Sequence, residues 1–254
     1  MLSKKEIHQI KSLKDSKARK NTQLFIAEGP KTVLELANGD FIPESIYCTE
    51  EQMDNLKAGL PVEIDLIAIS KKDLERISQL KTPNSVLGVF YVKNNPVPAY
   101  AKLNDLVFML DGINDPGNLG TIIRTADWFG VKHVICSEQC VDVYNPKVIQ
   151  STMGSVASVE VHYTNLKRYL EGLPDHISCY GAMSEGSNMY KTALASAAIL
   201  LIGSESHGIA KELHPFITHK VAIPGFSFRQ NKAESLNASI AAAIICSEIR
   251  RQQS

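Results

Sequence analysis

Apolar and polar positions follow two different periods along the first 93 residues of the chain. Strand-like apolar runs occupy residues 24–27, 45–48, 63–69 and 86–92, and helical patterns occupy residues 31–37 and 71–80. Ser70 stands directly before the second helical pattern, where its hydroxyl oxygen is expected to accept a free backbone N–H of the first turn. The pattern predicts a small α/β unit that ends near Lys93.

A proline-rich stretch follows this unit. Residues 94–98 read Asn-Asn-Pro-Val-Pro, and prolines at this spacing disfavour both a helix and a central strand. We therefore expect a smaller domain at residues 1–95, a linker at residues 96–104 and a larger domain at residues 105–254.

The larger domain carries a second series of strand-like and helical patterns. Strands are predicted at residues 106–110, 131–136, 198–202 and 220–223, and helices at residues 119–129 and from about residue 234 to 250. This alternation predicts a mostly parallel sheet covered by helices. Ligands of such sheets bind in loops beyond the carboxyl ends of the strands.

The composition is that of an ordinary globular protein, with 44% hydrophobic and 21% charged residues and a formal net charge of zero. Five scattered cysteines and seven histidines show no spacing suited to a metal site, so no metal is expected. The N-terminus lacks the apolar core of a signal peptide, and no apolar run is long enough to span a membrane. We expect a cytoplasmic protein without a membrane partner.

Three polar loops follow predicted strands of the larger domain. They are residues 111–120, which open a helix carrying Arg124, residues 203–208 (Gly-Ser-Glu-Ser-His-Gly), and residues 223–237, which end in Ser-Leu-Asn. Taken singly, these loops are equally typical of tight turns, and Ser235 is equally typical of a helix cap. Their occurrence in this order, each at the carboxyl end of a strand, indicates a ligand site.

As a set, the three loops resemble the motifs of the SpoU, or TrmH, family of RNA ribose methyltransferases in the SPOUT superfamily. The matching residues are Asn114, Pro116, Asn118, Gly120, Arg124 and Ala126 in the first motif, Gly203, Glu205 and Gly208 in the second, and Ile223, Pro224, Ser235, Leu236 and Asn237 in the third. The resemblance implies a SPOUT domain with a parallel sheet and a deep C-terminal trefoil knot. It also implies a homodimer in which each active site uses residues of both subunits.

The resemblance further implies methyl transfer from S-adenosyl-L-methionine to a ribose 2′-hydroxyl of RNA, without a metal. The expected cofactor-binding residues are Gly203, Ser204, Ile223, Pro224 and Leu236. The expected catalytic residues are Asn118, Arg124, Glu205, Ser235 and Asn237.

Two roles are open for Arg124. The family mechanism offers it as the base that removes the hydroxyl proton. A guanidinium is normally never deprotonated, however, so Arg124 is equally suited to hold the neighbouring phosphate while that phosphate or another group accepts the proton. Both roles make Arg124 indispensable.

The chain departs from the family pattern at two places. Gln150 stands where an arginine is common, and residues 225–233 form a longer loop that contains Phe226, Phe228 and Arg229. The longer loop is suited to stacking on RNA bases, and it is equally typical of an extended surface loop.

Basic residues cluster at the N-terminus, with eight lysines and arginines in the first 31 residues against three acids. Such clustering suits RNA phosphates, although it is also typical of a solvated helix face. The expected RNA-binding residues are Lys14, Lys17, Arg19, Lys20 and Lys147. The region resembles the substrate-binding domain fused to many SpoU-family enzymes, a small α/β domain like RNA-binding ribosomal proteins, and this architecture favours large-subunit rRNA as the substrate.

Three other functions were weighed against this hypothesis. A tRNA 2′-O-methyltransferase shares the motifs, and a catalytically silent RNA-binding assembly factor would keep the fold. The second is disfavoured because Arg124, Glu205, Ser235 and Asn237 are all present. A generic nucleotide-binding enzyme is disfavoured because neither GxxxxGK[ST] nor GxGxxG occurs.

Overall fold

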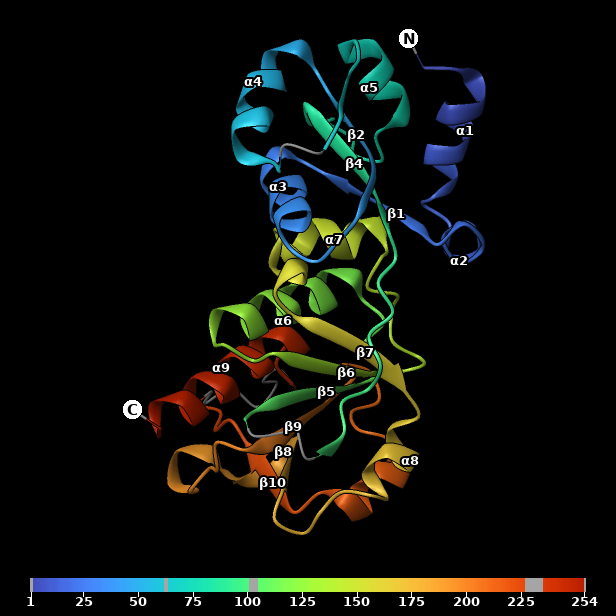
Figure 1. Ribbon diagram of the computed structural model, residues 1–254. Coiled ribbons are helices and arrows are strands. Elements are labelled where there is room, and N and C mark those ends of the chain that lie inside the picture. Colours follow the sequence, from blue (N-terminus) through green and yellow to red (C-terminus); the bar gives the residue numbers. More distant parts are fainter. Residues whose placement is uncertain (1, 62–63, 101–104, 227–234, 254) are drawn as a thin grey trace. The chain divides into compact units, whose positions relative to one another are not determined.

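The computed structural model describes residues 2–61, 64–100, 105–226 and 235–253 (Figure 1). The chain forms two compact units: unit 1 comprises Met1–Asn94 and Asp142–Ser158, and unit 2 comprises Asn95–Val141 and Val159–Ser254. The first crossing between the units lies at the proline-rich stretch. The segment Asp142–Ser158 departs from the expected boundaries, which place it in the larger domain.

Unit 1 is built on a four-stranded mixed sheet with the order β1-β4-β2-β3. β4 pairs antiparallel with β1 and β2, and β3 pairs parallel with β2. The strands are β1 (Leu24–Glu28), β2 (Pro43–Cys48), β3 (Leu66–Ala68) and β4 (Val86–Tyr91). The helices are α1 (Lys4–Ser12), α2 (Ser16–Thr22), α3 (Pro30–Asn38), α4 (Glu50–Gly59), α5 (Lys71–Ile77) and α7 (Pro146–Thr152).

The alternation of side chains along β1 divides the core of unit 1 between the two faces of the sheet. Leu24 and Ile26 join the apolar cluster formed with α1 and α5. Phe25 points to the opposite face, where its ring centroid lies 5.8 Å from that of Phe90 and 4.6 Å from that of Tyr144. Figure 1 shows α1 and α5 on one side of the sheet and α3 and α4 on the other.

The segment Asp142–Ser158 is fastened to unit 1 by polar contacts as well. The Tyr144 hydroxyl donates to the carbonyl oxygen of Lys93 at 2.7 Å and accepts the Lys93 backbone N–H at 3.0 Å. Asp142 accepts two N–H groups of the buried Arg19 guanidinium, at 2.9 and 2.7 Å. These contacts explain why the segment folds with unit 1 although it lies between two strands of unit 2 in the sequence.

Unit 2 is built on a six-stranded, fully parallel sheet with the order β10-β8-β9-β5-β6-β7. The strands are β5 (Val107–Asp111), β6 (His133–Ser137), β7 (Glu160–Thr164), β8 (Ser178–Asn188), β9 (Ala198–Gly203) and β10 (His219–Ala222). The α-helices are α6 (Pro116–Trp128), α8 (Leu166–Leu170) and α9 (Ala238–Arg251). Short 3₁₀ helices are η3 (Met189–Lys191) and η4 (Lys211–Phe216).

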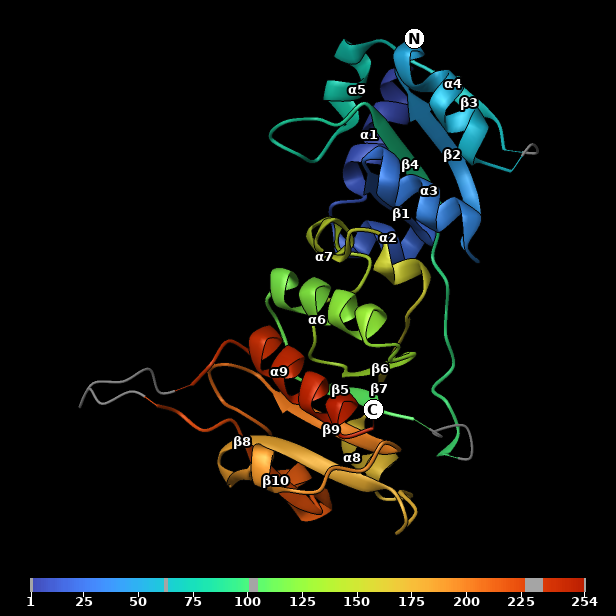
Figure 2. The same cartoon turned by 90° about the vertical axis from the view of Figure 1, so that its left-hand side faces the viewer.

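Helices cover both faces of this sheet. α6 and α9 lie side by side on one face, as Figure 2 shows. On the other face, Leu166 and Leu170 of α8 and Leu213 of η4 pack on Met109 and Leu201 of the central strands. The parallel sheet and its helical layers confirm the predicted α/β class; the trefoil knot stays a prediction. Within the described residues, no helix is long and apolar enough to cross a membrane.

Three details differ from the elements that the pattern predicts. The strands β7 and β8 were not predicted, and neither were the helices α1, α2, α4, α7 and α8. The strand predicted at residues 63–69 is shorter, Leu66–Ala68, and residues 62–63 lie outside the described residues. The last helix was predicted to begin near residue 234, which is wrong, because the Asn237 side chain accepts the N–H groups of Ser239 and Ile240 and starts the helix at Ala238.

Candidate active site

The first two loops leave neighbouring strands at the same edge of the unit 2 sheet. β5 ends at Asp111 and β9 ends at Gly203, and these two residues are register partners. An Asp111 carboxylate oxygen accepts the backbone N–H of Ala210 at 2.8 Å, which ties the start of the first loop to the end of the second. Parallel strands thus bring the loops together as expected.

The first loop leads directly into helix α6. Asp115 caps the helix, because its carboxylate accepts the backbone N–H of Asn118 at 2.8 Å, and Pro116 occupies the first turn. The cap places the Asn118 side chain at the amino end of α6, beside the second loop.

The second loop is a closed turn that only glycine can begin. The backbone groups of Ser204 and Gly208 exchange hydrogen bonds at 3.2 and 2.8 Å. A Cβ atom on Gly203 would lie 2.0 Å from the carbonyl carbon of Gly208, so the turn closes only without a side chain there. Gly208 itself has a φ of +67°, in the left-handed region. This turn presents Glu205 toward the third loop.

Asn118, Glu205 and Asn237 form an amide–carboxylate cluster that joins all three loops. The Asn237 side-chain amide donates to Asn118 Oδ1 at 2.8 Å and to Glu205 Oε1 at 2.6 Å. The same Glu205 oxygen accepts the Asn118 amide at 3.2 Å and the backbone N–H of Ala238 at 3.3 Å. Three of the five predicted catalytic residues therefore meet around one carboxylate oxygen, although they are up to 119 positions apart.

The other two predicted catalytic residues form no hydrogen bond or ion pair with this cluster in the described part of the chain. Arg124 is exposed on α6, six residues and about 9 Å along the helix axis from Asn118. It forms no hydrogen bond or ion pair with any residue in the described ranges. Ser235 is exposed and lies two residues before the cap residue Asn237.

The predicted cofactor-binding residues surround the ends of β9 and β10. Gly203 ends β9, Ser204 follows it, and Ile223 and Pro224 follow β10. Leu236 keeps 48% of its surface exposed. Ile223 and Pro224 are half-buried. Apolar side chains with part of their surface exposed suit the rings of an adenosyl group, which also needs a few hydrogen bonds for its polar atoms. In the longer third loop, Phe226 is exposed, whereas Phe228 and Arg229 lie outside the described residues.

Four of the five predicted RNA-binding residues are exposed lysines of unit 1, namely Lys14, Lys17, Lys20 and Lys147. Arg19 does not fit that prediction. It is 3% exposed, and its guanidinium donates to Asp142 and to the carbonyl oxygens of Leu13 and Lys14, the latter two at 2.9 Å. A buried guanidinium with these partners stabilises the fold and is not accessible to RNA phosphates.

Sequence reasoning missed two features of unit 2. Asp111 and Asp115 belong to the first motif loop, and their tasks as loop tie and helix cap become visible only with the backbone. His133 and His162 show no pairing in the sequence, yet their ring nitrogens lie 3.2 Å apart, because β6 and β7 are neighbouring strands.

Two family models match the chain. The SpoU rRNA Methylase family matches residues 105–247, and an MRM3-like substrate binding domain matches residues 4–88. Among curated relatives, the 23S rRNA (guanosine(2553)-2′-O)-methyltransferase RlmP of Bacillus subtilis is 28% identical over 242 residues, which cover 94% of each chain.

Solved structures resemble the whole chain as well. A putative RNA methyltransferase of the TrmH family from Porphyromonas gingivalis is 36% identical, covers 99% of both chains and superposes with a TM-score of 0.87. An AdoMet-bound rRNA methyltransferase from Sinorhizobium meliloti is 25% identical, with a TM-score of 0.85 over 100% of this chain and 98% of that one.

Proposed function

The chain belongs to the SpoU rRNA Methylase family, and we propose that its substrate is large-subunit ribosomal RNA. It is an RNA 2′-O-methyltransferase that uses S-adenosylmethionine, like the relatives that share its domain architecture. The observation that carries the proposal for the site is the amide–carboxylate cluster, which joins the three motif loops at the carboxyl end of the sheet.

The cluster positions the reacting groups. When bound, S-adenosylmethionine supplies an electrophilic methyl group on its sulfonium. Glu205 accepts hydrogen bonds from both amides, so it holds Asn118 and Asn237 in one orientation. Fixed orientation of a ribose oxygen behind the methyl group is worth about 7 to 11 kcal/mol of a transfer barrier. We assign the cluster and Ser235 to this orienting task.

Arg124 is assigned to the phosphate next to the target ribose. Its guanidinium is exposed and has no partner among the described residues, which leaves its five donors available for a bidentate phosphate contact. Because the guanidinium stays charged, the proton of the hydroxyl passes to the phosphate or to another group. From its place at the phosphate, Arg124 also stabilises the negative charge that develops on the attacking ribose oxygen.

Unit 1 is assigned to RNA binding. Lys14, Lys17, Lys20 and Lys147 are exposed there, and the MRM3-like substrate binding domain model covers most of this unit. A relative that spans the same two regions acts, by its name, on 23S rRNA. This architecture supports rRNA over tRNA as the substrate. We also propose a cytoplasmic location.

We also propose that the protein is a homodimer. Trp128 at the end of α6 is 84% exposed, and Ile240 on the neighbouring α9 is 49% exposed, so both helices present apolar surface that a second copy would cover. Sedimentation of the wild type is expected to give the mass of a dimer, and Trp128→Glu is expected to sediment as a monomer. Ile42→Glu, at an apolar position of unit 1 that is 67% exposed, should leave the dimer intact.

Transfer of labelled methyl groups to protein-free large-subunit rRNA and, separately, to total tRNA tests the substrate. Label is expected in rRNA, and Arg124→Ala is expected to abolish it. Arg168→Ala is the matched control, because Arg168 is an exposed arginine on α8, on the opposite face of the sheet. Label in tRNA alone would contradict the proposed substrate, and equal transfer by the Arg124 variant would contradict its role.

A further inference from the structure

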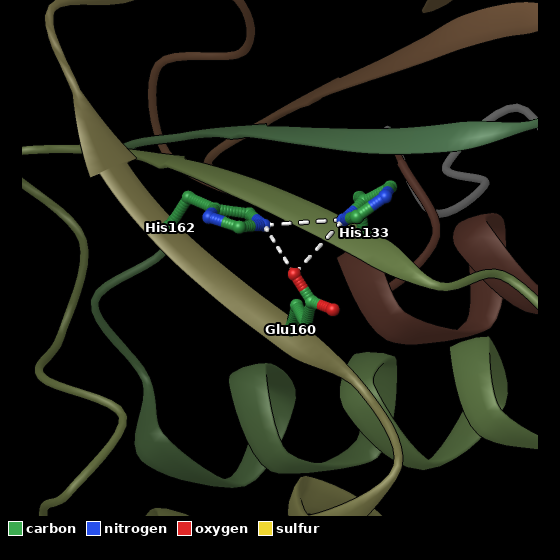
Figure 3. A group of neighbouring side chains, drawn as sticks. All are labelled: His133, Glu160 and His162. Atoms are coloured by element: carbon green, nitrogen blue, oxygen red, sulfur yellow. Dashed lines mark hydrogen bonds and ion pairs between the residues drawn. The ribbon is translucent and has the colours of Figure 1, made fainter. Parts of the chain in front are cut away.

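His133, Glu160 and His162 converge from two neighbouring strands of unit 2. His133 begins β6 and is the register partner of Glu160, which begins β7, and His162 lies two residues further along β7 on the same face. Figure 3 shows the three side chains pointing toward one another. One ligand-type atom from each lies within 4.8 Å of the other two. We call this group the His–Glu–His cluster.

The spacing of the three atoms is that of a metal coordination shell. His162 Nε2 lies 3.2 Å from His133 Nδ1, and Glu160 Oε2 lies 3.6 Å from His133 Nδ1 and 3.9 Å from His162 Nε2. The circle through these atoms has a radius of about 2.1 Å, close to the roughly 2.0–2.2 Å of Zn–N and Zn–O bonds. One point is therefore at bonding distance from all three.

The orientation of His162 supports ligation. Its side chain is fully buried, and its Nδ1 lies 3.3 Å from the backbone carbonyl oxygen of Asn95. When Nδ1–H donates to that oxygen, Nε2 carries the lone pair that faces His133 and Glu160. A backbone carbonyl in this place is typical of histidines that bind metals, because it fixes the tautomer and the ring.

Glu160 divides its two oxygens between solvent and the cluster. Oε1 lies 3.9 Å from the exposed Lys132 ammonium, whereas Oε2 faces both histidines. The Glu160 side chain is 38% exposed and that of His133 is 15% exposed, so an ion can enter from solvent and a water can complete the shell. Two imidazoles and one carboxylate form a ligand set that suits Zn²⁺.

We propose that the His–Glu–His cluster binds a divalent transition-metal ion, with Zn²⁺ the best match. The cluster lies at the amino ends of β6 and β7, whereas the motif loops leave the carboxyl ends of the strands, so the ion has a structural task. It fastens the edge strand β7 to β6. It also fixes the two places where the chain enters unit 2, because Asn95 and Val159 are the first residues of its two segments.

Metal binding is tested on the chelator-treated full chain by competition for Zn²⁺ with a chromophoric chelator. One ion is expected per chain, and His133→Gln and Glu160→Gln are each expected to weaken binding about 100-fold or more, at least as much as loss of a residue that supports a ligand. His176→Gln is the matched control, because His176 is an exposed histidine of the same unit outside the cluster. Binding that is unchanged in both cluster variants, or no binding by the wild type, would overturn the proposal.

Co²⁺ provides a readout that needs no variant. Paramagnetic shifts are expected on the ring signals of two histidines, without the thiolate-to-metal absorption that the five buried cysteines would produce if they bound the ion. Thiolate absorption, or shifted signals from other histidines, would assign the ion elsewhere and overturn the proposal. Zn²⁺ should also raise the unfolding temperature of the wild type and leave that of Glu160→Gln unchanged.

Discussion

Asn237 makes two kinds of contact at once, one within its own helix and one in the candidate active site. Its Oδ1 caps helix α9, and its Nδ2 donates to Asn118 and Glu205. The family motif identifies this asparagine from the sequence. The motif cannot separate the two roles, because an asparagine is equally suited to cap a helix and to donate a hydrogen bond in a site. Arg124 shows the converse. The motif names it, yet its distance from the cluster is a property of the folded helix.

Replacing Asn237 with aspartate separates the two tasks. Asn237→Asp keeps an oxygen that caps α9 but removes the amide donor and adds a negative charge beside Glu205. We expect the unfolding temperature to change little and kcat to fall about 100-fold, as misplaced reacting groups produce. Steady-state kinetics and thermal unfolding measure this. A variant as active as the wild type would remove the cluster from the mechanism.

Gly203 is expected to tolerate no side chain. Gly203→Ala places a Cβ 2.0 Å from the Gly208 carbonyl carbon, so the second loop must move, at a cost of about 1–3 kcal/mol. S-adenosylmethionine binding measured by calorimetry should fall with it. Gly225→Ala is the control for stability, because a Cβ there meets no atom of the described residues within 4 Å. Equal stability of the two variants would show that the turn is not tightly closed.

At the scale of elements, strands with continuous apolar runs were predicted well. β5 and β9 lie in the middle of the sheet and are buried on both faces, so their sequences read as unbroken apolar runs. β7 is an edge strand that begins with Glu160 and contains His162. Because of these polar residues, the search for apolar runs does not predict it. The His–Glu–His cluster was hidden with it, since its members meet only once the register of β6 and β7 is known.

The segment Asp142–Ser158 shows a second limit of local patterns. Its sequence reads as a connection between two strands of one domain, and its place in unit 1 depends on the distant partners Phe25, Lys93 and Arg19. Contacts this far apart in the sequence leave no periodic signal. The linker composition therefore predicted the first place where the chain passes from unit 1 to unit 2, and it missed the two later ones at either end of Asp142–Ser158.

Tyr144 should contribute measurably to the stability of unit 1. Tyr144→Phe removes both hydrogen bonds to Lys93 and is expected to lower the free energy of unfolding by about 1–2 kcal/mol near neutral pH. Burial raises the pKa of Tyr144 to about 12, so the hydroxyl stays neutral in the fold after an unfolded tyrosine, with a pKa of about 10, ionises.

The pH dependence checks this account of Tyr144. The stability that the hydroxyl contributes is present below the unfolded pKa and is lost as pH rises from about 10 to 12. Denaturant unfolding of the wild type and Tyr144→Phe should therefore converge over this interval. A constant difference between the two proteins would show that the hydroxyl is not buried as described.

At the scale of the whole molecule, the proposal assigns RNA binding to unit 1 and methyl transfer to unit 2. The triple variant Lys14→Ala, Lys17→Ala and Lys20→Ala removes exposed charges and should leave the fold intact. It is expected to weaken RNA binding and to reduce the slope of log K against log salt by about 2–3, because each phosphate contact contributes about 0.7–0.9.

Arg19→Ala should behave in the opposite way. It leaves Asp142 and two carbonyl groups without their buried partner and is expected to destabilise unit 1 by about 2–4 kcal/mol. Filter binding across a salt series and thermal unfolding separate the two effects. An unchanged salt slope in the triple variant would place the RNA elsewhere.

The position of the transferred methyl group is the most direct test of the central claim, that the three joined loops methylate a ribose of rRNA. Labelled rRNA is digested with alkali, which cleaves RNA except next to a 2′-O-methylated ribose. We predict that the label appears in alkali-resistant dinucleotides. The amount of label should fall about 100-fold in Glu205→Gln. It should be unchanged in Glu212→Gln, because Glu212 is an exposed glutamate of η4. Label on mononucleotides, or full transfer by Glu205→Gln, would contradict the claim.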